Sequence, residues 1–149
     1  MSIFFIVGCG DSELEIQEIE ISSTEINFPF EERKNGKFIS IFRNNGNEIV
    51  PISLFLIIRD TNDSLKNKNY CDEVNLIRQG RFISDWTIIN GNLPIIPEKE
   101  IINQNDHPGL VSYNLPLGTY ILMLNNEVAC SEKNYKVFEI TTNDAFEVN

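Results

Sequence analysis

The chain has 149 residues, of which 42% are hydrophobic, and its 22 acidic and 12 basic residues give a formal net charge of -10 at pH 7. A chain of this length is expected to fold as one domain around one core. The charge disfavours binding to the phosphate backbones of nucleic acids, and no apolar run reaches the roughly 18 residues that a membrane-spanning helix needs.

The first feature of the chain is a short apolar run that ends at a cysteine. The segment Ile6-Val7-Gly8-Cys9 resembles the lipobox of small bacterial envelope lipoproteins, in which an aliphatic residue stands three places before the cysteine that carries the lipid. The resemblance covers only about seven residues, up to the point where the chain becomes acidic. It implies that residues 1–9 are the remnant of a lipoprotein signal, that Cys9 is the lipidation site, and that residues 10–149 form a single domain outside the cytoplasm.

The residues before Cys9 depart from the lipoprotein pattern. A cleavable signal has a basic segment and roughly 7–15 apolar residues before the cleavage site, whereas residues 1–8 contain no Lys or Arg. Two explanations are open. Either the true start lies upstream of Met1, or Ile3 to Val7 form a buried first strand and Cys9 is an ordinary core thiol.

The N-terminal half shows the alternation of β-strands. Residues 13–16 and 18–21 each alternate glutamate with Leu or Ile, but the phase shifts by one residue between them, which predicts a β-bulge. Residues 38–42 are mostly apolar and have an Asn-Gly pair on each side, which predicts turns at both ends of that strand. Residues 52–58 are nearly all apolar, which favours a central strand covered on both faces.

The middle of the chain predicts one more strand and then a long loop. Residues 81–89 are typical of a strand that carries Trp86, the only tryptophan, and a third Asn-Gly pair follows at positions 90 and 91. Pro94, Pro97 and Pro108 come next, and each lacks the backbone donor that a paired central strand needs. Residues 93–108 are therefore expected to form the longest irregular loop.

The C-terminal third returns to strands. Residues 115–120 read Leu-Pro-Leu-Gly-Thr-Tyr, which is similar to the start of a strand in immunoglobulin-like and transthyretin-like sandwiches. Residues 135–140 predict a further strand, and Phe146 and Val148 a last edge. With about seven or eight strands and no convincing helix, we predict an all-β fold, an antiparallel β-sandwich.

The three cysteines divide into one near the N-terminus and a pair. If Cys9 carries lipid, Cys71 and Cys130 remain, and each follows a polar turn. An even number of cysteines in an oxidising compartment predicts a disulfide between them. The alternative is that they are unrelated buried thiols of a cytosolic protein.

Residues for catalysis or metal binding are few. His107 is the only histidine, no Gly-x-Ser-x-Gly motif occurs, and one histidine cannot build a multi-histidine metal site. The alternating oxygens that begin at Asp60 lack the glycine and the glutamate of a calcium loop. A weak calcium site built from Asp60, Asp63 and Asp106 of separate loops remains open. We therefore predict that the protein is not an enzyme and needs no cofactor.

Apolar side chains in the predicted long loop are the candidate binding surface. They are Leu93, Ile95, Ile96, Ile101 and Ile102. If they project from the loop, they form an exposed apolar patch of the kind that marks a partner-binding site. If the loop folds back over one open end of the sandwich, they are core instead.

These observations give three hypotheses for function. The first is a non-enzymatic membrane-anchored lipoprotein, facing the periplasm or the cell surface, which acts as an accessory or structural protein-binding subunit of a bacterial envelope or secretion assembly. In size, lipobox and predicted architecture the chain resembles such lipoproteins, including the outer-membrane lipoprotein of type VI secretion. The second is an extracytoplasmic carbohydrate- or peptide-binding module that uses Trp86, Tyr113 and Tyr120 as stacking surfaces. The third is a soluble cytoplasmic sandwich that binds other proteins.

Overall fold

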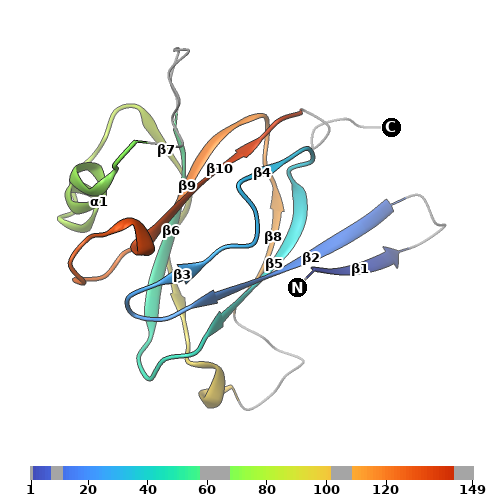
Figure 1. The fold of residues 1–149 in the computed structure, drawn as a ribbon, viewed down its shortest axis with the longest axis horizontal. Helices are drawn as coiled ribbons and strands as arrows, with labels where there is room; N and C mark the ends of the chain where they lie inside the picture. The colour runs from blue at the N-terminus through green and yellow to red at the C-terminus, as the bar shows by residue number, and fades with distance from the viewer. Residues whose placement is uncertain (1, 8–11, 58–67, 102–108, 143–149) are drawn as a thin grey trace.

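Two five-stranded β-sheets form the protein, and the computed structural model describes them over residues 2–7, 12–57, 68–101 and 109–142 (Figure 1). The predicted all-β sandwich is confirmed. The first sheet, sheet A, has the order β1-β2-β5-β8 with β3 beside β2, and the second, sheet B, has the order β4-β10-β9-β6-β7. Sheet A contains β1 (Ser2–Val7), β2 (Ser12–Ile21), β3 (Ile26–Asn27), β5 (Lys37–Asn44) and β8 (Leu110–Asn114). Sheet B contains β4 (Glu32–Arg33), β6 (Val50–Ile57), β7 (Trp86–Ile95), β9 (Gly118–Leu124) and β10 (Tyr135–Ile140).

Both sheets are mixed and not purely antiparallel. β2 pairs parallel with β5, and β10 pairs parallel with the short strand β4, while the other pairs are antiparallel. A parallel pair needs a connection that crosses between strand ends. Here the chain between β2 and β5 makes β4 in the opposite sheet on its way.

The main core lies between the two sheets. Sheet A contributes Ile19, Ile21, Phe38, Phe42 and Tyr113, all at most 7% exposed. Sheet B faces them with alternate residues of β6, β9 and β10, which are Val50, Ile52, Leu54, Tyr120, Leu122, Leu124, Phe138 and Ile140. Alternate side chains of a strand point to opposite faces. Phe55, Ile57, Ile121, Met123 and Tyr135 therefore point away from sheet A, whereas Leu56, in phase with Leu54, packs against the main core.

A second core covers the outer face of sheet B. This core is formed by outward residues of β6, β9 and β10, which are Phe55, Ile57, Ile121, Met123 and Tyr135. They pack against Tyr70, Val74 and Trp86, the first residue of β7. Val74 belongs to α1 (Cys71–Arg78), which lies against the outer side of sheet B in Figure 1. β6 is therefore buried on both faces, as its nearly continuous apolar sequence predicted.

The prediction of an irregular loop over residues 93–108 is wrong for residues 93–95. β7 runs from Trp86 through Pro94 to Ile95, and Pro94 lies opposite Pro51 of β6. A proline is accepted there because β7 is the edge strand of sheet B, with β6 on one side only. The third Asn-Gly pair is also no turn, because it lies where the register between β6 and β7 shifts, which is the position of a β-bulge.

Two further predictions along the chain need correction. Residues 81–85 are turns and coil, so the predicted strand begins only at Trp86. The bulge predicted in β2 is not found either, because β2 pairs with β1 and with β5 without a register shift. Instead Gln17, which is 2% exposed, takes an inward position in phase with Ile19 and Ile21. The two short 3-10 helices, Glu98–Glu100 and Glu132–Asn134, complete the elements of the described chain.

The N-terminal apolar run is a strand of the structure. β1 pairs with β2 at the edge of sheet A, and Val7 lies opposite Ser12 across the connection. The predicted lipidation site Cys9 lies in that connection, outside the described residues, as do Phe146 and Val148. β1 pairs with β2 alone and is the edge strand of the order β1-β2-β5-β8.

Candidate functional site

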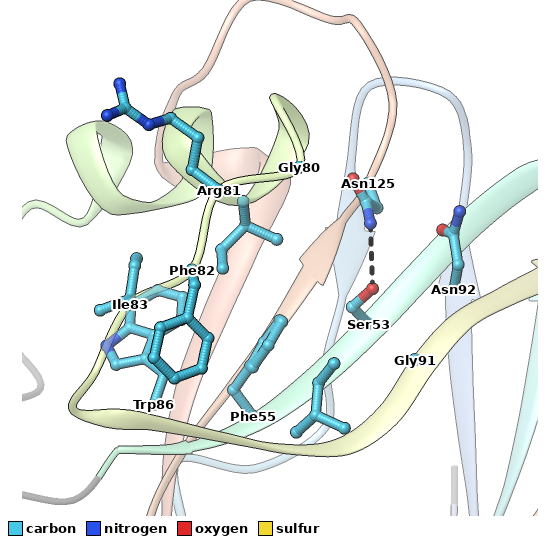
Figure 2. A pocket seen from close by; sticks show the side chains of 12 residues that line it. Ser53, Phe55, Gly80, Arg81, Phe82, Ile83, Trp86, Gly91, Asn92 and Asn125 are labelled. Carbon is cyan, nitrogen blue, oxygen red and sulfur yellow. Dashed lines mark hydrogen bonds between the residues drawn. The ribbon is translucent and has the colours of Figure 1, made fainter.

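A pocket of about 350 Å³ opens on the outer face of sheet B, beside the C-terminal end of α1. Its lining comes from three places: α1 and the segment after it (Ile77 and residues 80–83), strands β6 and β7, and Asn125 after β9. Figure 2 labels residues from all three. We call it the α1 pocket. It combines segments that are far apart in the sequence, so no local motif marks it.

Aromatic side chains form one end of the α1 pocket. The rings of Phe55 and Trp86 lie with centroids 5.3 Å apart and are 4% and 6% exposed. Phe82 and Ile88 also line the pocket, yet they are 85% and 60% exposed. Since Ile88 lies opposite Phe55 across the β6–β7 pair, its side chain shares the outer face with that ring. The buried rings thus make the floor and the exposed side chains make the rim.

Amide and hydroxyl groups form the other end. The Asn125 Nδ2 group donates a hydrogen bond of 3.2 Å to Ser53 Oγ, and Asn92 lies beside them (Figure 2). Arg81 is the one ionisable residue in the lining, and in Figure 2 its guanidinium points away from the pocket. The pocket therefore offers apolar contact with a few hydrogen-bonding groups and no acid–base pair.

The wall of the pocket depends on how α1 ends. Gly80 has φ +76°, a left-handed conformation that glycine adopts without penalty. With it, the Gly80 N–H donates to Ile77 O at 2.9 Å and the Arg81 N–H donates to Leu76 O at 2.9 Å. This pair of bonds satisfies carbonyl groups at the end of the helix. It also turns the chain toward Phe82 and Trp86, so the glycine sets the direction of the rim.

Arg78 ties α1 to the segment after β9. Its Nε donates to Leu124 O at 3.0 Å and its Nη1 donates to Val128 O at 2.7 Å. Burial lowers the pKa of this guanidinium. A cation in the last turn also interacts favourably with the helix dipole. The side chain thereby fixes α1 relative to Asn125, on the opposite wall of the pocket.

A disulfide fixes the other end of α1. Cys71, the first residue of the helix, is bonded to Cys130, with 5.6 Å between the Cα atoms and a separation of 59 positions in sequence. The predicted pairing is confirmed. The start of α1 and the segment that ends at Cys130 are thus joined covalently over the outer face of sheet B.

Of the five residues predicted as a partner-binding patch, the four that the structure describes are buried or half-buried. Leu93 packs against the main core, Ile95 is 1% exposed within that core, and Ile96 and Ile101 are half-buried. Ile102 lies outside the described residues. The physical reason is the sheet itself, because β7 pairs with β6 up to Ile95 and so turns that side chain inward.

The predicted stacking aromatics are also separated. Tyr113 and Tyr120 are buried between the sheets, at 7% and 0% exposed, and only Trp86 reaches the α1 pocket. Sequence reasoning missed Phe82 and Ile88 because both fell in a predicted strand, where apolar residues are expected to be core. One signal was present: Phe82 and Ile83 are adjacent, and neighbours in a strand cannot both face one core.

Metal chemistry finds no support in the part of the chain that the structure covers. No group of three or more His, Cys, Asp or Glu side chains gathers there to hold an ion. The calcium candidates Asp60, Asp63 and Asp106, like His107, lie outside that part.

Comparisons with protein-family models, with curated proteins and with solved structures return no match to this chain. Among the described residues, no helix has both the length and the apolar character needed to cross a membrane. The geometry of the α1 pocket is therefore what bears most directly on function.

Proposed function

We propose that this chain is a non-enzymatic lipoprotein of a bacterial cell envelope, anchored through Cys9, that binds a protein partner as an accessory or structural subunit of an envelope or secretion assembly. In this proposal an apolar side chain of the partner enters the α1 pocket between Phe82 and Ile88. The observation that carries it is the placement of these two exposed side chains on the rim of one pocket.

The distribution of exposed apolar residues supports the pocket as the binding site. Five large apolar side chains among the described residues are clearly exposed, and Ile49, Leu110 and Leu117 are the other three. None of those three lines the α1 pocket. Protein interfaces concentrate binding energy in a few aromatic or aliphatic anchors that fill desolvated pockets. A rim of Phe82 and Ile88 over a floor of Phe55 and Trp86 fits such an anchor.

A carbohydrate is a poorer fit for the same pocket. A sugar presents hydroxyl groups in all directions, and each must find a hydrogen-bonding partner when it is buried. The lining offers such groups mainly at Ser53, Asn92 and Asn125, all at one end. The rest of the lining is apolar, which suits a partner's side chain better.

Two features support a place outside the cytoplasm. The disulfide between Cys71 and Cys130 belongs to the kind that persists in oxidising compartments. In addition, the start of β2, which follows Cys9 in the chain, lies at the opposite end of the molecule from α1 (Figure 1). A lipid on Cys9 would therefore hold the α1 pocket away from the membrane, where a partner can reach it.

Replacing the rim residues tests the binding site. Phe82→Ser and Ile88→Ser should abolish retention of the partner in pull-downs from solubilised envelopes, because each removes an anchor contact. The free energy of unfolding should change by no more than about 0.5 kcal/mol, as is usual for exposed positions. Leu110→Ser is the matched control, since Leu110 is 54% exposed and also lies on an edge strand. Retention of the same partner by both rim variants would refute the assignment.

Replacing Cys9 tests the anchor separately. Cys9→Ser, expressed with the coding sequence that precedes it in the gene, should move the protein from the membrane fraction to the soluble envelope fraction. Stable anchoring requires more than one acyl chain, so intact mass of the native protein should show two or three acyl chains on Cys9. An unchanged membrane fraction for the variant would exclude Cys9 as the anchor.

A further inference from the structure

We propose that the disulfide between Cys71 and Cys130 is a redox switch for the α1 pocket, so that the pocket is complete only in the oxidised protein. The inference rests on the proposed function of the pocket and adds its regulation. Under it, chains that are still reduced lack the binding face, and partner binding begins only after oxidation. Three features of the structure carry it.

The first feature is a short path from the disulfide to the pocket floor. Tyr70, next to Cys71, is 1% exposed and packs with its ring centroid 6.1 Å from Trp86 and 6.0 Å from Tyr135. The Tyr70 N–H also donates to the Tyr135 hydroxyl at 3.1 Å. The disulfide thus holds Cys71 in place, and with it the adjacent Tyr70, whose ring covers Trp86. Trp86 in turn lines the pocket.

The second feature is that one segment holds both ends of α1. Residues 124–130 accept the Arg78 hydrogen bonds at Leu124 and Val128, and they supply Cys130 for the disulfide. The same segment contains Asn125, which lines the pocket opposite α1. The separation between the two walls is therefore set by one covalent bond at the helix start and two hydrogen bonds at its end.

The third feature is the weakness of α1 without that bond. The helix has eight residues, and Val74 is its only buried one. Helices shorter than about 12–15 residues are marginal by themselves in water, so packing and the disulfide must hold this one. The two sheets depend much less on the disulfide, because the main core between them contains no residue of α1.

The chemical step is ordinary thiol–disulfide exchange with a disulfide-bonded oxidoreductase. One of the two cysteine thiolates attacks a sulfur of the acceptor's disulfide and forms a mixed disulfide, which releases one acceptor thiolate. The second cysteine thiolate then attacks the mixed disulfide, and the Cys71–Cys130 bond forms. The pair loses two electrons and two protons, and the acceptor leaves as a dithiol. A dithiol reductant drives the reverse reaction.

Trp86 makes the proposal measurable, since it is the only tryptophan in the chain. The experiment uses the folded full chain with Cys9→Ser, so that Cys71 and Cys130 are the only thiols, before and after reduction with tris(carboxyethyl)phosphine. Reduction should move Trp86 emission to longer wavelength and increase its quenching by acrylamide. Removing the reductant and reoxidising the pair should restore both.

Hydrogen exchange locates the change and separates it from unfolding. The amides of Val74, Gly80 and Arg81, which donate the hydrogen bonds of α1 and its end, should exchange at least about tenfold faster after reduction. The amides of β9 should keep their protection. The variant Cys71→Ala with Cys130→Ala should reproduce the reduced state without any reductant, and if this variant does not fold, reduction of the folded protein still gives the result.

Two outcomes would overturn the proposal. One is unchanged Trp86 emission and unchanged exchange in α1 after complete reduction. The other is an equal loss of hydrogen-exchange protection in α1 and β9, which would show that the disulfide stabilises the whole fold and not α1 in particular. Neither measurement needs a partner, so the rim variants test the proposed function independently. If reduction frees α1 while both rim variants still retain the partner, the switch stands and the binding assignment fails.

Discussion

Gly36 allows the backbone before β5 to approach the backbone after β8 closely. A Cβ atom at this position would lie 1.8 Å from Leu115 O and 2.7 Å from the carbonyl carbon of Leu115. The Leu115 N–H donates to Gly36 O at 2.9 Å, which continues the pairing of β5 with β8. Only a residue without a side chain permits this backbone approach. The sequence identified this glycine as part of a turn but not as a point of contact.

Gly36→Ala should destabilise the protein strongly. The methyl group meets backbone atoms, which cannot move aside as the end of a side chain can, so the cost is at least about 1–3 kcal/mol. Urea denaturation followed by far-ultraviolet circular dichroism measures it. Gly91→Ala is the control, because nothing lies within 4 Å of a Cβ there. Equal stability of the two variants would contradict the close approach at Gly36.

Asn44 precedes the Asn45-Gly46 pair and holds the bend that this pair makes. It is 1% exposed, and its Nδ2 donates to Glu48 O and Ile95 O while its Oδ1 accepts from the Gly46 N–H. The pairs at positions 35 and 45 were interpreted as hairpin turns. The chain does bend at both, but each bend carries it between sheet A and sheet B. Asparagine and glycine favour turns for local reasons, and they do not specify which strand follows.

At the scale of elements, α1 is the feature that the sequence did not predict. Its eight residues mix two acidic residues, an asparagine and a cysteine with only three aliphatic side chains, Val74, Leu76 and Ile77. The acidic residues stand in the first turn and Arg78 in the last, which suits the helix dipole. Such a short segment becomes helical because sheet B, the disulfide and Arg78 hold it.

Arg78→Met should weaken this element. The side chain donates to two backbone carbonyls, and hydrogen bonds from a charged group contribute roughly 1.5–3 kcal/mol. We expect a loss of that size in urea denaturation, with faster hydrogen exchange in α1. Arg81→Met serves as the control, since Arg81 is exposed, and should change the free energy of unfolding by about 0.5 kcal/mol or less. If both variants unfold at the same urea concentration, Arg78 does not clamp the helix.

At the scale of the whole molecule, sheet B is the central layer between two cores. One core joins it to sheet A and the other joins it to α1. The larger core contains Tyr113 and Tyr120, whose hydroxyl groups differ. The Tyr120 hydroxyl donates to Pro116 O at 2.7 Å, whereas the Tyr113 hydroxyl has no hydrogen-bond partner among the described residues. Burial raises the pKa of Tyr113 above its usual range and that of Tyr120 to about 12.

These two tyrosines make the folded state sensitive to alkali. In the unfolded chain a tyrosine loses its proton near pH 10.0, whereas Tyr120 keeps it to about pH 12 when folded. Between these values the unfolded chain binds fewer protons than the folded one, so the free energy of unfolding falls as pH rises. The stabilisation is complete below pH 10.0. Urea denaturation between pH 9 and pH 12 should show this fall.

Phenylalanine substitutions separate the two hydroxyls. At neutral pH Tyr120→Phe should cost about 1 kcal/mol for the lost hydrogen bond, while Tyr113→Phe should cost close to nothing because it removes an unpaired buried group. In alkali each variant should lose less stability than the parent. An identical pH profile for the parent and the double variant would show that other groups cause the alkaline loss.

Local patterns in the sequence indicated the all-β architecture and offered the pairing of Cys71 with Cys130 as one of two alternatives. Alternating glutamate and isoleucine in residues 18–21, and the almost continuous apolar run of β6, follow directly from which faces of a strand are buried. Cys71 and Cys130 are paired, which was the expected pairing if Cys9 is set aside. These properties depend on local patterns and on composition, which is why they could be predicted.

Other features depend on contacts between distant parts of the chain. Pro94 and the Asn-Gly pair at position 90 lie inside β7 because that strand is at an edge and bulged, which sequence cannot foresee without knowing the strand order. Phe82 follows the end of α1 and Ile88 lies on the outer face of β7, and both stay exposed where these elements line one pocket. Long-range packing sets which apolar side chains are covered, so it placed the candidate site where no local pattern pointed.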